Sequence, residues 1–170
     1  MLTRLLKSAL LSASVWLSEP AFALDNPSRE FQLKSAYLFH FAELTQWPAM
    51  GPITICLRGD SPIRHFLPAL EGQKIEGNIV HVLLEPPATL EACNILFVGD
   101  IDELKPRLFE QARAAHILLV GDVDGFAAQG GMVQFTLRDN KLKLVVNLGS
   151  VKSADLKLSS KLLRMAEIIE

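Results

Sequence analysis

The sequence predicts a single compact α/β domain with a mainly parallel central sheet, a C-terminal antiparallel β-hairpin and helices on both faces of the sheet. The spine of the sheet is predicted from three short apolar runs, at residues 53–60 (ITICLRGD), 93–100 (CNILFVGD) and 117–122 (ILLVGD). Each run is rich in Ile, Leu and Val and closes on Gly-Asp, which is typical of a buried parallel strand that ends in a turn. The chain has 170 residues, 49% of them hydrophobic, which suits one domain with its own core.

Residues 1–23 have the pattern of a secretory signal peptide. Arg4 and Lys7 precede an apolar run, and Ala21 and Ala23 are the small residues that a signal peptidase reads. The alternative is a membrane anchor, but the run has about ten residues and a spanning helix needs about 20. We therefore expect residues 1–23 to be removed on export and residues 24–170 to form the domain, in the periplasm.

The charge of the exported chain argues against nucleic acid as a partner. Losing Arg4, Lys7 and Glu19 from the 17 basic and 19 acidic side chains leaves a net charge near −3, whereas nucleic-acid binding uses a basic face. Export also separates the chain from ATP and most soluble nucleotides. The glycines of residues 121–131 have neither the GxGxxG nor the P-loop spacing, so we expect no cofactor.

The first helix of the domain is predicted to begin after Asn26, an N-cap residue, with Pro27 in its first turn, and to end before Pro48. Apolar side chains recur within it at spacings of three and four, which makes one wide apolar face. This face either packs in the core or forms a site for a small apolar or aromatic ligand. The residues of that ligand site are Tyr37, Phe41 and Trp47.

The segments between the spine strands carry cap and stop residues, such as Asp60-Ser61-Pro62 and Pro86-Pro87. Helices are expected at residues 63–70, 88–92 and 102–114, a strand at 79–84 and a loop at 121–131.

The C-terminal hairpin has a register that can be checked. Strands at 132–138 and 141–147 flank Asp139 and Asn140, which both tolerate the left-handed backbone of a two-residue turn. The apolar pairs that this turn predicts are Val133 with Val146, Phe135 with Leu144, and Leu137 with Leu142. Because these pairs share one face and the charged residues share the other, we expect a one-faced hairpin with the apolar face inward.

The last segment is predicted to be a helix capped by Ser159 or Ser160. Its apolar stripe consists of Leu162, Met165, Ala166 and Ile169. Leu163 and Ile168 fall off this stripe, so the helix is either buried on both sides or leaves one side to a partner or a second copy of the chain. The residues of the partner-binding surface are Leu162, Leu163, Met165, Ile168 and Ile169.

Aspartates close all three runs of the spine, at Asp60, Asp100 and Asp122. The carboxyl ends of parallel strands meet at one edge of a sheet, so these side chains, with Asp102 and Asp124, could form a calcium or magnesium site. The competing explanation, which we favour, is that each aspartate caps the helix after its strand. No catalytic or metal-ligand set has recognisable spacing, so we expect no catalytic residue, no metal site and no enzymatic activity.

The chain has two cysteines, Cys56 and Cys93, and export favours a disulfide between them. Aligning the two Gly-Asp ends offsets the cysteines by three residues, about 10 Å along the strands, which is too far for a bond. A bridge therefore requires a stagger of the two strands, or a segment before the second strand that lies back across its neighbour. Buried free thiols are the alternative.

Several segments of the chain resemble the YfiR family. The similar pieces are residues 34–48 (KSAYLFHFAELTQWP), ICLRGDSP, CNILFVGD, 125–135 (GFAAQGGMVQF), 140–148 and 158–164 (LSSKLLR), in the same order. Members of this family are small periplasmic α/β proteins described as inhibitors of an inner-membrane diguanylate cyclase. The resemblance implies that the chain binds the periplasmic sensor portion of such a cyclase and represses it, which lowers cyclic di-GMP and biofilm formation.

The resemblance also has implications for regulation. It implies release when the inhibitor is oxidatively misfolded or captured elsewhere at the envelope, with an outer-membrane lipoprotein as a further partner. Family members can carry more cysteines, and only the Cys56 and Cys93 pair is carried over here. The alternative function is a periplasmic binding protein that takes a small apolar or aromatic ligand and feeds another envelope sensor.

Overall fold

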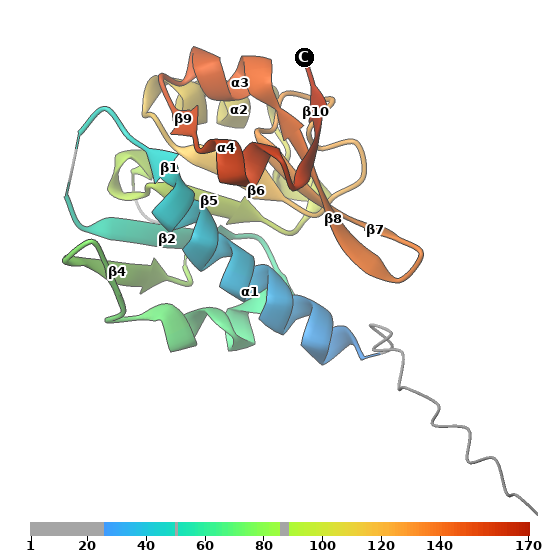
Figure 1. Cartoon of the computed structure of the whole chain (residues 1–170), viewed down its shortest axis with the longest axis horizontal. Helices are drawn as coiled ribbons and strands as arrows, with labels where there is room; N and C mark the ends of the chain where they lie inside the picture. Colours follow the sequence, from blue (N-terminus) through green and yellow to red (C-terminus); the bar gives the residue numbers. More distant parts are fainter. Residues whose placement is uncertain (1–25, 50, 86–88) are drawn as a thin grey trace, which may run out of the picture.

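The computed structural model describes residues 26–49, 51–85 and 89–170 (Figure 1). The expected signal peptide, residues 1–23, and Pro86-Pro87 lie outside these residues. The α-helices are α1 (Pro27–Leu44), α2 (Pro106–Ala114), α3 (Leu148–Ser153) and α4 (Ser160–Leu163). Short 3-10 helices are η1 (Pro62–His65), η2 (Leu67–Leu70), η3 (Leu90–Ala92) and η4 (Ile101–Glu103).

An eight-stranded sheet forms the centre of the domain, in the order β10-β8-β7-β6-β5-β2-β4-β3, and β1 and β9 form a separate pair. The strands are β1 (Thr45–Gln46), β2 (Ile53–Arg58), β3 (Lys74–Ile75), β4 (Asn78–Leu83), β5 (Ile95–Val98), β6 (Leu118–Gly121), β7 (Val133–Arg138), β8 (Lys141–Asn147), β9 (Lys157–Leu158) and β10 (Ala166–Ile169). Most pairs in the sheet are parallel, and β7 and β8 are the antiparallel hairpin. Helix α1 lies in front of the sheet in Figure 1 and α2 behind it. The predicted α/β class is therefore confirmed.

The predicted start of the first helix is also confirmed. The Asn26 side chain accepts a hydrogen bond from the Ser28 N–H, and Pro27 occupies the first turn. The helix ends at Leu44, although Pro48 would allow it to continue for a few more residues. It ends there because Thr45 and Gln46 pair with β9 instead. The helix expected at 102–114 is divided for a related reason: α2 begins only at Pro106, since a residue before proline disfavours the helical backbone.

The hairpin has the register that the sequence predicts, with Val133 opposite Val146 and Leu137 opposite Leu142. Asp139 and Asn140 form its turn with φ angles of 52° and 54°. The expectation of a single buried face is wrong at the base of the hairpin, where Gln134 and Val145, on the other face, are buried as well. Since helices cover both faces of the sheet there, the hairpin projects beyond them only at its tip, as Figure 1 shows.

The predicted C-terminal helix is the main error of secondary structure. Helix α4 ends at Leu163, and residues Ala166–Ile169 form β10, which pairs in parallel with Leu144–Asn147 of β8. The apolar stripe has helical spacing, but β8 offers a row of unpaired backbone groups, and β-branched Ile168 and Ile169 suit a strand.

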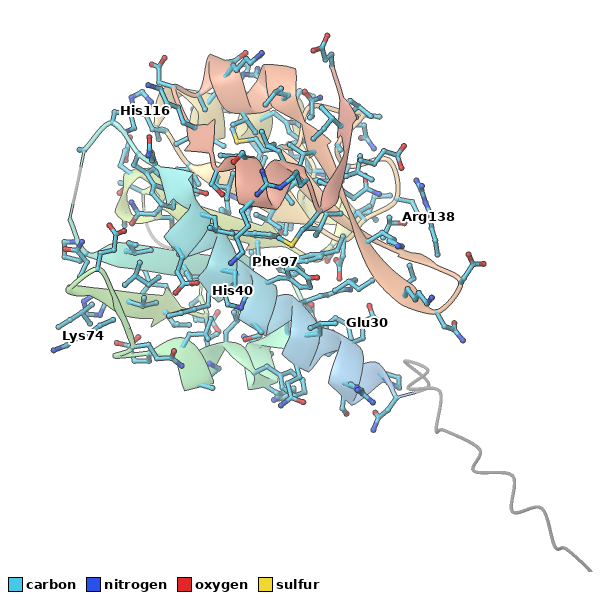
Figure 2. All side chains as sticks on the ribbon, in the orientation of Figure 1. Glu30, His40, Lys74, Phe97, His116 and Arg138 are labelled. Carbon is cyan, nitrogen blue, oxygen red and sulfur yellow. A yellow bond between two sulfur atoms is a disulfide. The ribbon has the colours of Figure 1, made fainter. Side chains whose placement is uncertain are left out.

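Aromatic rings join the two ends of the chain in the core between α1 and the sheet. Phe41 of α1 stacks on Phe135 of β7, with ring centroids 5.6 Å apart, and Tyr37 and Phe97 also contact Phe135. Figure 2 shows Phe97 in the middle of the molecule. The first helix and the C-terminal hairpin therefore share one core.

Candidate functional site

Cys56 and Cys93 form a disulfide, with their Cα atoms 5.9 Å apart, so the predicted bond is confirmed. Both residues are buried in the core. Cys56 lies in β2 directly beside Leu96 of β5, so the two cysteines are offset by three residues, as the aligned Gly-Asp ends require.

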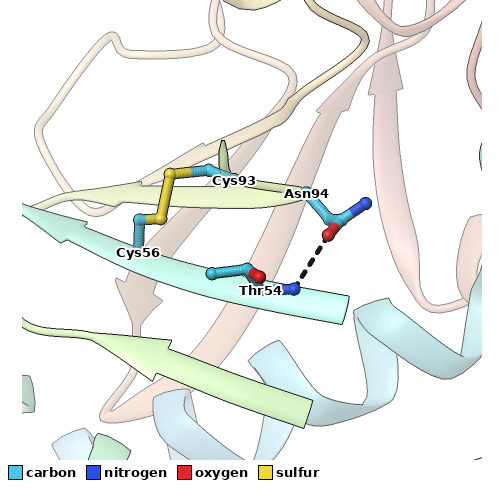
Figure 3. The surroundings of a disulfide bond; sticks show 4 residues. All are labelled: Thr54, Cys56, Cys93 and Asn94. Atoms are coloured by element: carbon cyan, nitrogen blue, oxygen red, sulfur yellow. Dashed lines mark hydrogen bonds between the residues drawn. A yellow bond between two sulfur atoms is a disulfide. The ribbon is translucent and has the colours of Figure 1, made fainter. Parts of the chain in front are cut away.

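The bond forms because the chain turns back immediately before β5. Asn94 makes two hydrogen bonds to Thr54 of β2, each 2.8 Å long. Its backbone N–H donates to the Thr54 carbonyl, and its side-chain Oδ1 accepts from the Thr54 N–H. Figure 3 shows Cys93 lying back along the strands from Asn94, opposite Cys56. The strands are not staggered, and the segment before β5 crosses its neighbour, which is the second of the two predicted geometries.

The aspartates that close the three spine strands have three different roles. Asp100 caps η4 and accepts a hydrogen bond from the Asp102 N–H, which confirms one predicted cap. Ser61 rather than Asp60 caps η1, and Asp60 is exposed. Asp122 caps no helix, because a turn and not a helix follows β6, so the cap prediction is wrong for this residue.

Asp122 belongs instead to a buried ion cluster at the carboxyl end of β6. The Lys34 ammonium of α1 lies 2.6 Å from Asp122 Oδ2 and 2.5 Å from Glu30 Oε1, and it also lies over the Phe31 ring. Lys34 is only 4% exposed. One lysine therefore holds the first half of α1 to the end of a central strand.

Burial raises the pKa of Asp122 above its ordinary value, and the nearby Glu30 carboxylate acts in the same direction. The hydrogen bond and charge of Lys34 oppose this rise without cancelling it. Sequence reasoning missed this cluster. The spacing of Glu30 and Lys34 by four residues was visible, but the third partner lies 88 residues away from Lys34.

The three residues predicted to bind a ligand are not in one place. Phe41 is fully buried and stacks with Tyr37 and Phe135, inside the core. Trp47 lines a pocket of about 330 Å³ at the amino ends of β2 and β4, together with residues of α1, β1 and β3. The described geometry therefore separates Trp47 from the other two.

The residues predicted to bind a partner are also divided. Leu162 is fully buried and Leu163 packs against the core, whereas Met165 and Ile168 are 46% and 40% exposed. Ile168 and Ile169 lie in β10, which is an edge strand of the sheet. Exposed apolar side chains therefore border the outer edge of β10, with which no strand of the described residues pairs.

Among residues 26–49, 51–85 and 89–170, no group of three or more His, Cys, Asp or Glu side chains is placed to hold a metal ion. None of the helices within these ranges is both long and apolar enough to cross a membrane.

The model of the YfiR/HmsC-like family matches residues 31–167, which include the central sheet from β2 to β8 and the first two residues of β10. None of the curated proteins compared with the chain matches it. The family match covers most of the chain and agrees with the mainly parallel α/β fold, and the chain therefore belongs to the YfiR/HmsC-like family.

Proposed function

We propose that this protein is a periplasmic repressor that binds the sensor portion of an inner-membrane diguanylate cyclase and holds it inactive, so that cyclic di-GMP and biofilm formation fall. At the level of the family, membership supports a periplasmic regulator in cyclic di-GMP signalling, and a regulator rather than an enzyme. The partner and the mode of repression are the parts that we propose.

The observation that carries this proposal is the free edge of β10. An edge strand presents unpaired N–H and C=O groups to which a partner strand can add. Met165 and Ile168 supply exposed apolar surface beside that edge, while Leu162 anchors the segment in the core. This combination of a fixed base and an exposed apolar edge suits a binding surface for another protein, including a second copy of this chain.

Repression requires that the protein bind the inactive state of the sensor more tightly than the active state, because a partner shifts an equilibrium only through differential affinity. Converting a sensor from mostly active to mostly inactive takes about 5 kcal/mol of such difference. A strand-edge contact with two apolar side chains can contribute to that difference through backbone hydrogen bonds and burial.

Ile168→Asp tests this surface. We expect the variant to be exported and folded but to lose capture of the sensor portion and to raise cellular cyclic di-GMP toward the level of a deletion strain. Ile79→Asp is the matched control, since Ile79 is 43% exposed and lies in β4, near the opposite end of the sheet. Leu163→Asp is unsuitable, because Leu163 packs against the core.

Deletion of the whole chain tests the repressor role independently of the surface. Cellular cyclic di-GMP is expected to rise in the deletion strain and to return to its starting level when the chain is supplied again. An unchanged level would exclude repression of a cyclase. Normal repression by the Ile168→Asp variant would exclude the β10 edge as the binding surface but would leave the repressor role intact.

A second candidate function is binding of a small apolar or aromatic ligand, which would feed another envelope sensor. The pocket beside Trp47 favours it. Quenching of Trp47 fluorescence by a metabolite is the expected signature. This function can coexist with repression, and so can tuning by the disulfide or capture by an outer-membrane lipoprotein.

A further inference from the structure

The pocket beside Trp47 has an unbalanced set of charges. Its apolar walls come from Ala42, Trp47, Ile53 and Ile75. Glu43 of α1 and Glu76 of the turn between β3 and β4 also line it, and none of the lining residues that the structure describes is Lys, Arg or His. The pocket is therefore apolar with two carboxylates, which disfavours an anionic ligand and favours a cationic one.

The two carboxylates differ in their surroundings. Glu43 Oε2 lies 2.7 Å from Nδ1 of His40, and both of these side chains are exposed. Glu76 is in none of the ion pairs of the described chain. Glu76 is therefore the clearer position for an incoming positive charge.

A second, independent observation concerns hydrogen bonding. In the described part of the chain, two buried side-chain polar atoms have no partner, and they are Thr45 Oγ1 and Trp47 Nε1. Both residues line this pocket, and Thr45 is only 7% exposed. Buried polar groups are nearly always hydrogen-bonded, so these two atoms are available to pair with a molecule bound beside them.

We propose that this pocket binds a small amphipathic amine that also carries a neutral oxygen. Its ammonium group meets the carboxylates of Glu43 and Glu76, its apolar part packs on Trp47 and Ile53, and its oxygen accepts the indole N–H. The Thr45 hydroxyl can accept from the ammonium group or donate to the oxygen. This inference rests on the second candidate function and names the chemical class of its ligand.

Three compounds of similar shape test the charge requirement. They are 2-amino-1-phenylethanol, its neutral counterpart 1-phenyl-1,2-ethanediol, and the anion mandelate. Binding of each to the protein purified from the periplasm is measured by titration calorimetry at pH 7 and low salt. Because exposed ion pairs are individually weak, we expect the amine to bind about tenfold more tightly than the diol, and mandelate more weakly than both.

Variants assign the effect to the pocket. Glu76→Gln is expected to reduce the affinity for the amine toward that for the diol and to leave the diol unchanged. Glu110→Gln, an exposed carboxylate on α2 that does not line the pocket, is the matched control and should leave all three affinities unchanged. Trp47→Phe keeps an aromatic wall but removes the N–H, and it should weaken both the amine and the diol.

The outcomes separate this inference from the function on which it rests. Equal binding of amine and diol, or an amine affinity that is unchanged in Glu76→Gln, would overturn the cationic class while leaving a ligand pocket. Absence of binding by all three compounds would overturn the inference, and quenching of Trp47 fluorescence by other metabolites would still decide the second function. Cellular cyclic di-GMP decides repression in either case.

Discussion

At the scale of single residues, Lys34 is the most consequential charge in the core. It lies between Glu30 and Asp122, and all three side chains are largely removed from water. A buried charge is tolerated only when it is paired, so the lysine and its two carboxylates depend on one another.

Removing Lys34 should therefore be costly. In Lys34→Met the side chain keeps its length but leaves Glu30 and Asp122 facing each other, so we expect a loss of about 3 kcal/mol in the free energy of unfolding. Urea denaturation measures this loss. Lys34→Met combined with Asp122→Asn should recover part of it, and an equal loss in the double variant would show that the ion cluster is not its source.

The raised pKa of Asp122 predicts whether the free energy of unfolding rises or falls with pH. Because the folded protein binds this proton more tightly than the unfolded chain, the stability that Asp122 contributes is fully present below its ordinary pKa of 3.8 and is lost as pH rises through the folded value. The stability of the wild type relative to Asp122→Asn should thus fall as the pH rises from 3.8 toward neutral. Urea denaturation over this range measures it. A difference that grows with pH would mean that attraction to Lys34 outweighs burial.

The disulfide should make a large contribution to stability. Cys56 and Cys93 are 37 residues apart in the sequence, and closing a loop of that length lowers the entropy of the unfolded chain by an amount worth about 4 kcal/mol. The Cys56→Ala, Cys93→Ala double variant should be less stable than the oxidised wild type by about this amount. Its urea midpoint should not respond to reductant, whereas the wild-type midpoint should fall. Equal stability of both proteins without reductant would contradict a structural role for the bond.

At the scale of elements, the hairpin turn is the feature most closely controlled by local chemistry. Asp139 and Asn140 both have positive φ, which Asn and Asp tolerate and β-branched residues do not. This turn determines which residues of β7 and β8 lie opposite each other. The register of the hairpin therefore follows from Asp139 and Asn140 alone.

Asn140→Val should therefore lower the free energy of unfolding by about 1–2 kcal/mol, because it places a β-branched residue in the left-handed region. Lys141→Val, one residue later in β8, is the matched control and should have little effect, since that position has strand geometry. Urea denaturation of both variants measures the contrast. Similar stability of the two would show that the turn backbone adjusts without cost.

The C-terminal segment shows the limit of pattern reasoning at this scale. Leu162, Met165 and Ile169 have helical spacing, and the pattern is also compatible with a short strand after a turn. The edge of β8 decides between the two, because its backbone groups need partners that the segment can supply. That edge is a tertiary feature, so no inspection of residues 159–170 alone could have found it.

At the scale of the whole molecule, the stack of Phe41 on Phe135 makes α1 and the hairpin parts of one core. We therefore expect a single cooperative unfolding transition, in which the fluorescence of Trp47 and the far-UV circular dichroism change together. Phe135→Ala should lower the free energy of unfolding by about 3–5 kcal/mol and shift both signals equally. Separate transitions for the two signals would show that the ends of the chain unfold independently.

The sequence by itself determined the spine of the sheet and the hairpin register, and it predicted the bond between Cys56 and Cys93. The first two depend on local patterns, namely apolar runs closed by Gly-Asp and a turn that tolerates positive φ, whereas the bond depends on the chain turning back before β5. Only the tertiary structure decided the places of Lys34 and β10. Each depends on a group that is distant in sequence, namely Asp122 for Lys34 and the open edge of β8 for β10. The physical reason is that side chains and backbone groups become buried only when distant segments of the chain meet. A charge, a hydroxyl or a strand edge that is buried in this way requires a partner.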